Sequence, residues 1–333
     1  MRTKFLALTV LTLLLVFACQ TESDDTFVSE SSQKKIDMSA VNKDVLGNPI
    51  SISSSKNGEG LLKSSGDRRV AVYMAEYITS GESHEMGNTV YFYNHGNKQL
   101  GGDFVPGLFL DDTDGTNEIS YYVDDKRPSL DLSVGETNNA IDRAMNTWDE
   151  VICSDIGMFE RPSIDDSSGF IARSISDQIY DLFGIPDYFG GSYDYFADVT
   201  HAGWMNPLFF DIIEAGGSQF ILGVTFTIVW VDEDGNLTDV DKNGKYDVAW
   251  REIYYNDGFP WADGDHYDVE TIALHEAGHG LSQGHFGKAF RNKGGLHFAP
   301  RSVMNAAYSG IQTSINETDN GGHCSNWAQW PNN

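Results

Sequence analysis

The segment from residue 275 to residue 285 constrains this chain more than any other, because it contains three histidines and a glutamate. His275 and His279 are four residues apart, so on a helix their imidazoles project from the same face. Glu276 lies next to the first of them. His285 can approach the pair only if the helix ends soon after His279, so the segment predicts a helix followed at once by a turn.

The turn requires backbone freedom, which we expect Gly280 and Gly284 to supply. Three imidazole nitrogens suit a tetrahedral Zn²⁺ ion and leave its fourth position open, which is typical of catalytic rather than structural zinc sites. The sequence therefore predicts a zinc site formed by the three histidines, with Glu276 placed to reach a water molecule at the metal. Solvated histidines on a surface helix and a purely structural zinc ion are the alternatives.

This segment resembles HExxHxxGxxH, the zinc signature of the metzincin metallopeptidases, and within that clan the matrixin-like branch. One position differs, because Ser282 replaces the glycine of the signature. A second family mark, the methionine turn below the metal, is matched by Ser302–Tyr308 with its Met304. In matrixins a tyrosine four residues after that methionine lines the pocket for the substrate side chain after the cleaved bond, and Tyr308 is at that position. The resemblance covers about residues 115–310.

The resemblance implies an α+β, metzincin-like (zincin) catalytic domain: a twisted, mostly parallel sheet with an antiparallel edge strand, an active-site helix and a Met-turn. Phe220–Phe226 resembles that edge strand, whose backbone at Leu222, Gly223 and Val224 would pair with an extended substrate. The implied activity is a zinc endopeptidase acting on extracellular proteins or peptides, with Glu276 as general base.

Two other functions remain open. A non-catalytic surface protein for binding or adhesion could use the same scaffold as a lipoprotein. A gluzincin-type peptidase would take its third zinc ligand from a downstream glutamate such as Glu317. The spacing of His285 favours the metzincin interpretation over the second of these.

The first nineteen residues resemble the signal peptide of a bacterial lipoprotein. Arg2 and Lys4 precede an apolar run from Phe5 to Phe17, which is too short to span a bilayer comfortably. The run ends in Val16–Cys19, which is similar to a lipobox. We therefore expect residues 1–18 to be removed, Cys19 to be lipidated, and the protein to be exported and anchored at the cell surface or outer membrane. An ordinary signal peptide with an incidental cysteine is the alternative.

The rest of the chain is divided by composition. Residues 19–65 are rich in Ser, Asp, Lys and Asn and predict a flexible tether. Residues 66–114 are interpreted as an N-terminal extension or pro-segment, and residues 115–333 as the catalytic domain. With 49 Asp and Glu against 22 Lys and Arg, the net charge of −27 disfavours nucleic acid and anionic lipid as partners. We expect a monomer that meets a membrane only through its lipid anchor.

Two cysteines remain in the exported part, Cys153 and Cys324. An oxidising compartment and an even count favour one disulfide between them, with two buried free thiols as the alternative.

A second metal site is suggested by an acidic loop. Asp239, Asp241, Asn243 and Asp247 match the first nine positions of an EF-hand-like loop, D-x-D-x-N-G-x-x-D. The glutamate of position twelve is absent, since Trp250 stands there, and the flanks look like strands. The loop is a candidate for Ca²⁺, and a solvated hairpin turn is the alternative.

Apolar patterning predicts the remaining elements. Strands are predicted at residues 69–78, 89–94, 118–123, 196–200, 220–231 and 248–256. Helices are predicted at residues 136–152 and 174–183, and from the N-cap Asp268 to about Ser282. No regular pattern is predicted after residue 284. Four other histidines are interpreted as surface or structural: His201, His266, His297 and His323.

Overall fold

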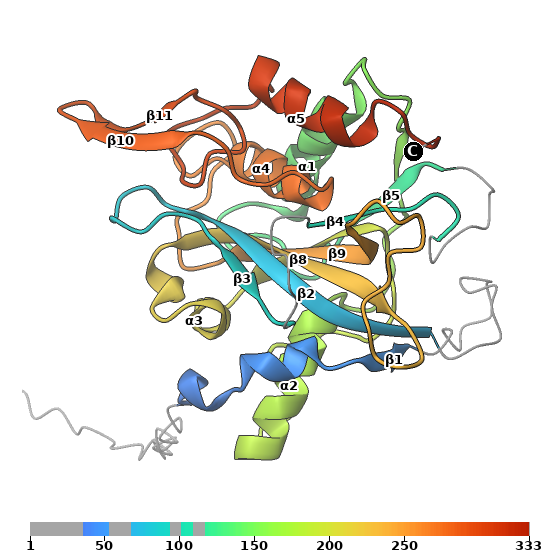
Figure 1. The fold of residues 1–333 in the computed structure, drawn as a ribbon. Coiled ribbons are helices and arrows are strands. Elements are labelled where there is room, and N and C mark those ends of the chain that lie inside the picture. Colours follow the sequence, from blue (N-terminus) through green and yellow to red (C-terminus); the bar gives the residue numbers. More distant parts are fainter. Residues whose placement is uncertain (1–35, 53–67, 94–100, 109–116, 333) are drawn as a thin grey trace, which may run out of the picture. The chain divides into compact units, whose positions relative to one another are not determined.

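A nine-stranded sheet with helices on both faces organises the part of the chain that the structure, a computed structural model, describes: residues 36–52, 68–93, 101–108 and 117–332 (Figure 1). The strand order is β1-β2-β8-β9-β7-β5-β6, with β3 also on β2 and β4 also on β9. The strands are β1 (Ile50–Ile52), β2 (Arg68–Thr79), β3 (Thr89–Tyr91), β4 (Gly102–Asp103), β5 (Ile119–Val123), β6 (Met158–Glu160), β7 (Val199–Met205), β8 (Ile221–Val231) and β9 (Tyr246–Asn256).

The sheet is mixed rather than mostly parallel. β5, β6, β7 and β9 pair in parallel, whereas β8 is antiparallel to β9, and β2 is antiparallel to β8, β1 and β3. The α+β class is compatible with this architecture, but the predicted antiparallel edge strand is wrong. β8 is flanked on both sides, because the N-terminal residues add further strands beyond it.

The helices lie on both faces of the sheet, with α1, α4 and α5 on one side and α2 and α3 on the other (Figure 1). They are α1 (Val134–Asp149), α2 (Phe170–Phe183), α3 (Leu208–Ile213), α4 (Val269–Gly280) and α5 (Glu317–Trp327), with short 3₁₀ turns at η1 (Met38–Ala40), η2 (Lys43–Gly47) and η3 (Gly217–Gln219). A separate hairpin consists of β10 (Lys288–Asn292) and β11 (Gly295–Ala299). In the part of the chain that is described, no helix has the length and apolarity needed to cross a membrane.

Helix α1 packs against helix α4. A capping box between Ser133 and Glu136 starts it, and its apolar side is completely buried. The Trp148 indole N–H donates to the carbonyl oxygen of Leu274 in α4, 2.9 Å away, which locks the two helices together. The predicted end at residue 152 is wrong, because the helix stops at Asp149 and Ile152 is 98% exposed.

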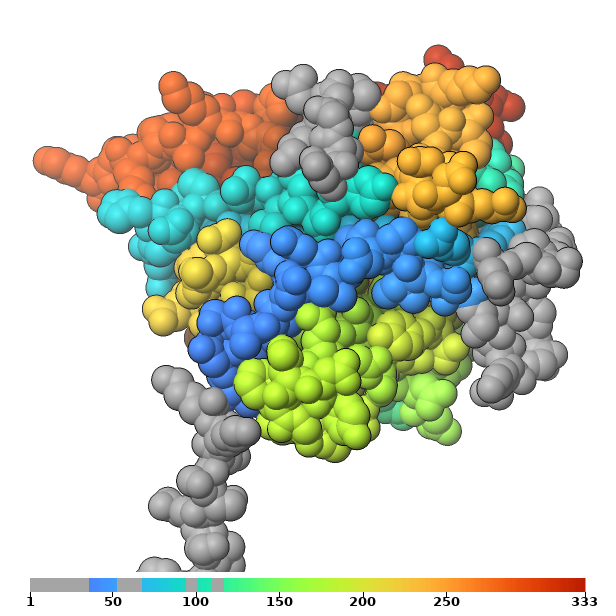
Figure 2. Space-filling model, turned by 60° about the horizontal axis from the view of Figure 1, so that its bottom comes forward, coloured from blue at the N-terminus to red at the C-terminus, as the bar shows by residue number. Residues whose placement is uncertain are grey.

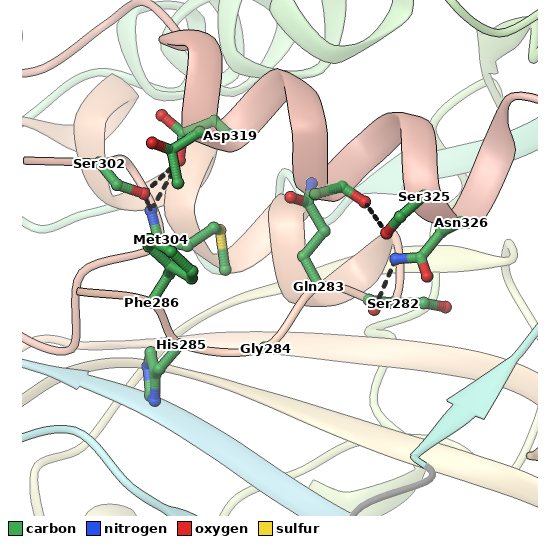
Figure 3. A pocket seen from close by; sticks show the side chains of 12 residues that line it. Ser282, Gln283, Gly284, His285, Phe286, Ser302, Met304, Asp319, Ser325 and Asn326 are labelled. Carbon is green, nitrogen blue, oxygen red and sulfur yellow. Dashed lines mark hydrogen bonds between the residues drawn. The ribbon is translucent and has the colours of Figure 1, made fainter. Parts of the chain in front are cut away.

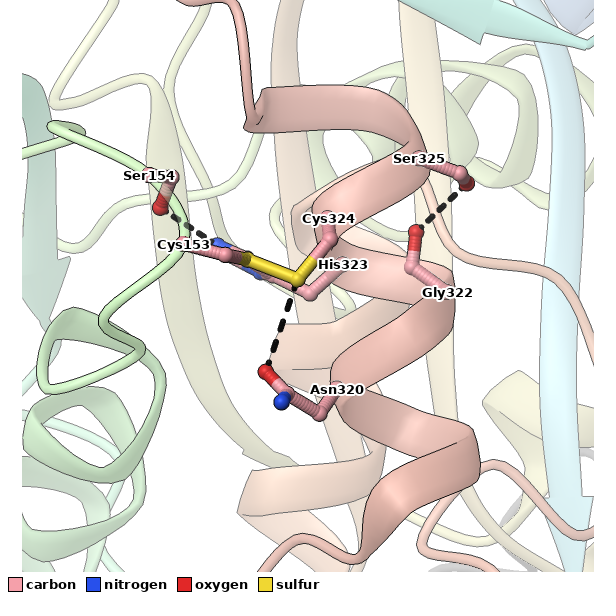
Figure 4. The surroundings of a disulfide bond; sticks show 7 residues. All are labelled: Cys153, Ser154, Asn320, Gly322, His323, Cys324 and Ser325. Atoms are coloured by element: carbon pink, nitrogen blue, oxygen red, sulfur yellow. Dashed lines mark hydrogen bonds between the residues drawn. A yellow bond between two sulfur atoms is a disulfide. The ribbon is translucent and has the colours of Figure 1, made fainter.

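The elements after residue 284 were not predicted, and α5 shows why. Its sequence carries few apolar residues, so no helical stripe is visible, and its start depends on a capping box between Asn316 and Asp319. A disulfide between Cys153 and Cys324, with Cα atoms 5.7 Å apart, ties α5 to the segment after α1 (Figure 4). The pairing agrees with the one expected from the sequence.

Part of the predicted tether is folded, so the prediction is wrong for residues 37–52. Leu46 is 1% exposed and Met38 is also buried, and β1 pairs with the start of β2. Figure 2 shows this segment in blue, lying across the surface beside α2. Sparse apolar residues suffice here because the rest of the fold provides the surface that they cover. Residues 1–35, including the predicted signal peptide and Cys19, lie outside the described residues.

The extension predicted at residues 66–114 belongs to the same compact unit as the rest of the folded chain. β2 pairs with β8 over almost its whole length, and Val70, Ala71, Val72 and Ala75 are at most 1% exposed. The predicted strand at 196–200 is displaced, because β7 begins at Val199.

Candidate metal centre

Helix α4 carries the first part of the site and is packed on all sides. Asp268 caps it, accepting a hydrogen bond from the backbone N–H of Thr271 at 2.8 Å, as the sequence predicts. Gly278 has no space for a side chain, since a Cβ there would lie 2.3 Å from the sulfur of Met304. A Cβ at Gly280 would lie 3.0 Å from a methyl group of Val199, a tight but smaller overlap. The methionine turn therefore supports the helix directly beneath the histidines.

The three histidines converge. The Nε2 atom of His279 lies 3.1 Å from that of His275 and 3.2 Å from that of His285. They form one of two groups of potential metal-binding side chains among the described residues. Glu317, the alternative third ligand, is exposed at the start of α5 and is not in this group.

The opposite ring nitrogens fix the orientation of two imidazoles. His275 Nδ1 lies 2.7 Å from the carbonyl oxygen of Val303, and His279 Nδ1 lies 2.6 Å from that of Gln283. A carbonyl oxygen can only accept, so these nitrogens carry the protons and the Nε2 lone pairs face one another. Burial lowers the pKa of His275 to about 4, and the pKa values of His279 and His285 fall well below their usual range for the same reason. The cluster is therefore neutral at pH 7, and three neutral imidazole nitrogens are a donor set that zinc favours.

Glu276 lies beside the cluster and is completely buried. The Thr225 hydroxyl donates to its Oε2 at 2.5 Å, while Oε1 is buried without a hydrogen-bond partner among the described residues. Burial raises the pKa of Glu276 well above its usual value, and the hydrogen bond from the Thr225 hydroxyl opposes the rise. Gly223 makes room for the carboxylate, since a Cβ there would lie 3.0 Å from Oε1.

The turn to His285 does not use the glycines that the sequence suggested. Neither Gly280 nor Gly284 has a positive φ, and Ser282, which replaces the signature glycine, itself adopts φ 67°. The side-chain amide of Asn326 in α5 donates to the carbonyl oxygen of Ser282 at 3.0 Å (Figure 3). The left-handed residue is needed where the signature glycine stands, because the backbone must reverse within two residues of the helix end.

Helix α5 also holds the methionine turn, a contribution that the sequence did not reveal. Asp319 accepts a hydrogen bond from the Ser302 hydroxyl (Figure 3). It also accepts one, at 3.0 Å, from the backbone N–H of Val303. Met304 is buried below the histidines. A cavity of about 310 Å³ separates α5 from the turn at residues 282–286. The Asn316-x-x-Asp319 capping box was the one available signal, and it indicated a helix start rather than a support for the site.

The predicted substrate residues are close to the cluster but already have partners. Gly223 pairs with Ile78 and Val224 with Tyr77 across the β2–β8 register, and β2 also lies alongside Leu222. The backbone N–H of Tyr308 donates to the carbonyl oxygen of Thr79 at 2.8 Å. The edge predicted to receive a peptide is therefore occupied by β2.

A second buried carboxylate, Glu76 on β2, was also missed. Its Oε2 lies 3.4 Å from Nδ1 of His279. Burial raises its pKa to about 7, against the opposing effect of the Arg251 guanidinium. No sequence motif marks Glu76, because only the sheet register brings β2 next to α4.

The acidic loop forms the second group. Carboxylate oxygens of Asp239, Asp241 and Asp247 lie within 4.8 Å of one another. The Asn243 amide donates to Asp241 at 2.9 Å and to Asp103 at 2.8 Å, so β4 contributes a carboxylate that the motif did not include. Burial raises the pKa of Asp103 and of Asp247.

The other histidines have the roles expected. His201 and His323 are buried in the core, and His266 and His297 lie at or near the surface. Comparisons with known protein families and with curated proteins found no match to this chain. The chemistry of the site therefore has to be inferred from its own atoms.

Proposed function

We propose that this protein is a zinc-dependent endopeptidase that hydrolyses peptide bonds of extracellular proteins, on a metzincin-like catalytic domain of the matrixin-like type. The observation that carries the proposal is the convergence of three neutral imidazoles beside the buried Glu276 carboxylate, whose Oε1 has no hydrogen-bond partner among the described residues. Three histidine ligands leave the fourth position of a zinc ion open, as in catalytic sites, and the neighbouring carboxylate supplies the base that hydrolysis requires.

His275, His279 and His285 would hold the zinc ion. When bound, zinc supplies Lewis acidity, which acidifies water and polarises the peptide carbonyl. Glu276 accepts a proton from the attacking water and delivers it to the amine nitrogen as the C–N bond breaks. Its raised pKa suits a group that must carry a proton between these two events, and the Thr225 hydroxyl keeps it oriented.

The fold supports the same proposal. Parallel strands β5, β7 and β9 are followed in the chain by α4 with its histidines and then by a methionine packed beneath them. Tyr308 borders a small cavity next to His275, as expected for the wall of a pocket that receives a substrate side chain.

The setting of the activity is part of the proposal. Lipidation at Cys19 would hold the protein at the outer surface of a bacterial cell, with protein or peptide substrates as its partners, no nucleic acid, and a monomeric state. The acidic loop is proposed as a structural Ca²⁺ site, because its donors are carboxylate and amide oxygens, which are the ligands that calcium takes.

The decisive experiment combines metal removal with one isosteric substitution. We expect the purified protein to hydrolyse casein, to lose that activity with a zinc chelator, and to regain it with zinc. The Glu276→Gln variant should keep one zinc ion per chain while activity falls by about a thousandfold or more. Thr147→Val, on the exposed side of α1, is the control variant. If Glu276→Gln left casein hydrolysis at the parental rate, the proposal would be wrong, and a non-catalytic binding lipoprotein would be favoured.

A further inference from the structure

An extended peptide that reached Glu276 would have to lie in the strip between residues 221–224 of β8 and the segment at residues 306–308. We call this strip the substrate position. β2 enters this strip with a defined polarity: it runs antiparallel to β8 and makes a parallel bridge between Thr79 and Ala307. Both sides are hydrogen-bonded, since the carbonyl oxygen of Thr79 accepts from Tyr308 at 2.8 Å and the N–H of Ser80 donates to Phe220 at 2.8 Å. These are the backbone groups that strand addition of a substrate would use.

A side chain of β2 also fills the pocket beside the cluster. Ile78 is 3% exposed and lines, with Thr271, Val303 and Tyr308, a cavity in which only about 20 Å³ remains. That volume holds about one water molecule and no side chain. A substrate residue can enter this pocket only after Ile78 has left it.

The peptide bond between Tyr77 and Ile78 lies over the proposed catalytic group. Ile78 is paired with Gly223, the residue whose Cα faces the Glu276 carboxylate. On the other side, the return of the hairpin is packed so closely that a Cβ at Gly87 would lie 2.2 Å from the carbonyl oxygen of Tyr77. The same Cβ would lie 3.0 Å from the imidazole of His285.

The loop that follows β2 is more exposed than the strand itself. Residues 70–78 belong to the buried sheet, whereas Glu82, His84, Glu85 and Asn88 in the connecting loop are exposed. The loop is held by polar contacts rather than by a buried apolar side chain: the N–H of Gly87 donates to Ala306 at 2.6 Å, Arg291 of β10 donates to the carbonyl oxygens of Gly81, at 2.9 Å, and Ser83, and His266 lies 3.5 Å from Glu82. In Figure 1 this loop reaches out below the β10–β11 hairpin. Such a segment can open locally without unfolding the sheet.

We propose that residues 77–88, the hairpin tip, occupy the substrate position as a built-in peptide mimic, so that the folded chain hydrolyses casein only through the minor fraction of molecules in which the tip has opened, and its activity rises when the tip is released. The inference rests on the proposed peptidase function, since only a peptidase has a substrate to exclude. The evidence that the tip occupies the strip is the backbone pairing of β2. The block is steric, and it uses the backbone pairing groups that a substrate would use.

Gly87→Ala tests the proposal with the smallest possible change. The added methyl group collides with the carbonyl oxygens of Tyr77 and, at 2.5 Å, Ala306, so the tip must move away. Gly135→Ala, at the exposed start of α1, is the matched control, because a Cβ there meets nothing within 4 Å. Ile78→Ala is a second variant, which removes the side chain from the pocket and serves if Gly87→Ala fails to fold.

The first readout is binding and needs no turnover. In the Glu276→Gln background with zinc sulfate present, fluorescence anisotropy follows a fluorescein-labelled peptide that copies residues 74–81. We expect Gly87→Ala and Ile78→Ala to bind it about tenfold or more tightly than the parent and the Gly135→Ala control, since the closed state no longer competes. Unchanged affinity in variants that remain folded by circular dichroism would overturn the proposal.

Casein hydrolysis by the same variants with Glu276 intact is the second readout. A rise with Gly87→Ala and none with Gly135→Ala supports latency. If peptide binding tightens but no variant hydrolyses casein, the hairpin tip is a mimic and the peptidase proposal fails. If all variants hydrolyse casein equally and peptide binding is unchanged, the peptidase proposal stands and the latency proposal fails.

Discussion

The histidine cluster and the acidic loop each bring three metal-binding side chains within 4.8 Å of one another, but different parts of the structure hold them in place. His275 and His279 are buried, and carbonyl oxygens of distant or turned segments fix their rings. Asp239 and Asp241 instead accept hydrogen bonds from backbone N–H groups of their own loop, at Gly244 and Asn243. The core therefore imposes the geometry of the first site, whereas local sequence creates most of the second.

The largest expected difference between the two sites concerns zinc. We expect His279→Ala to weaken zinc binding by at least about a thousandfold, because it removes the central nitrogen of a preformed set. Asp241→Ala should leave zinc affinity unchanged. Titration with a chromophoric chelator measures both, and a comparable loss in the two variants would show that the sites are not independent.

The support from α5 gives the next largest effect. Asp319→Ala removes the acceptor for Ser302 and Val303 beneath the histidines, so we expect zinc affinity to fall about 10- to 100-fold and the free energy of unfolding by about 3 kcal/mol. Glu317→Ala, on the exposed side of the same helix, is the control. If Asp319→Ala changed stability without changing zinc affinity, the core would not be orienting the ligands.

The pH values at which the two sites lose their metal ions should lie closer together than the pKa values of free imidazole and carboxyl groups. Free imidazole and carboxyl groups titrate about 2.6 pH units apart. Burial lowers the pKa of His275 to about 4, so protons displace zinc only as the pH falls towards that value. Burial raises the pKa of Asp103 and Asp247, so calcium is displaced at a higher pH than for free carboxylates. Metal content after dialysis over an acidic pH series tests this, and a zinc midpoint near 6 would contradict it.

Calcium itself should have a modest effect. We expect millimolar calcium to raise the melting temperature of the parent by a few degrees, because it offsets repulsion among the three aspartates. Asp241→Asn should reduce that rise, while Glu233→Gln, in the neighbouring turn, should not. An equal rise in all three proteins would show that calcium acts elsewhere.

The smallest expected effect is a change in stability at two non-glycine residues with left-handed backbone. These are Ser282, at φ 67° near the histidines, and Lys242, at φ 61° in the acidic loop. Replacement of either by glycine should raise the free energy of unfolding by up to about 1 kcal/mol through relief of backbone strain. We expect the larger gain at Ser282, whose hydroxyl oxygen is buried without a partner among the described residues. Urea unfolding measures both, and a loss at Ser282 would mean that its hydroxyl stabilises the turn.

Much of the histidine cluster could be predicted, because its parts lie close together in the chain. The four-residue spacing of His275 and His279 and the abrupt end of α4 follow from helix geometry. The source of the turn did not follow, since the glycines on either side were the obvious candidates and the strained residue was Ser282. The strands with long apolar runs, β8 and β9, were also found, within two residues of their ends.

What could not be predicted depends on pairing between distant segments. Nothing in residues 68–79 states that this strand will lie against β8 rather than stand apart as a pro-segment, because strand partners share no local code. The same holds for α5, whose polar sequence becomes a support only when Asp319 and Asn326 meet the turns beneath and behind the histidines.

The amino-acid sequence alone thus determined the ligand set, the neighbouring carboxylate, the acidic loop and the cysteine pair, because short-range spacing and residue chemistry are sufficient for each. The tertiary structure alone decided that β8 has no free edge, that Ile78 fills the pocket beside Tyr308, and that Glu76 and Asp103 reach the two sites. The physical reason is that backbone hydrogen bonds can form between any two strands, while the side-chain contacts that select the partner come from segments distant in the chain, so only the folded chain specifies which strand occupies the position that a substrate would need.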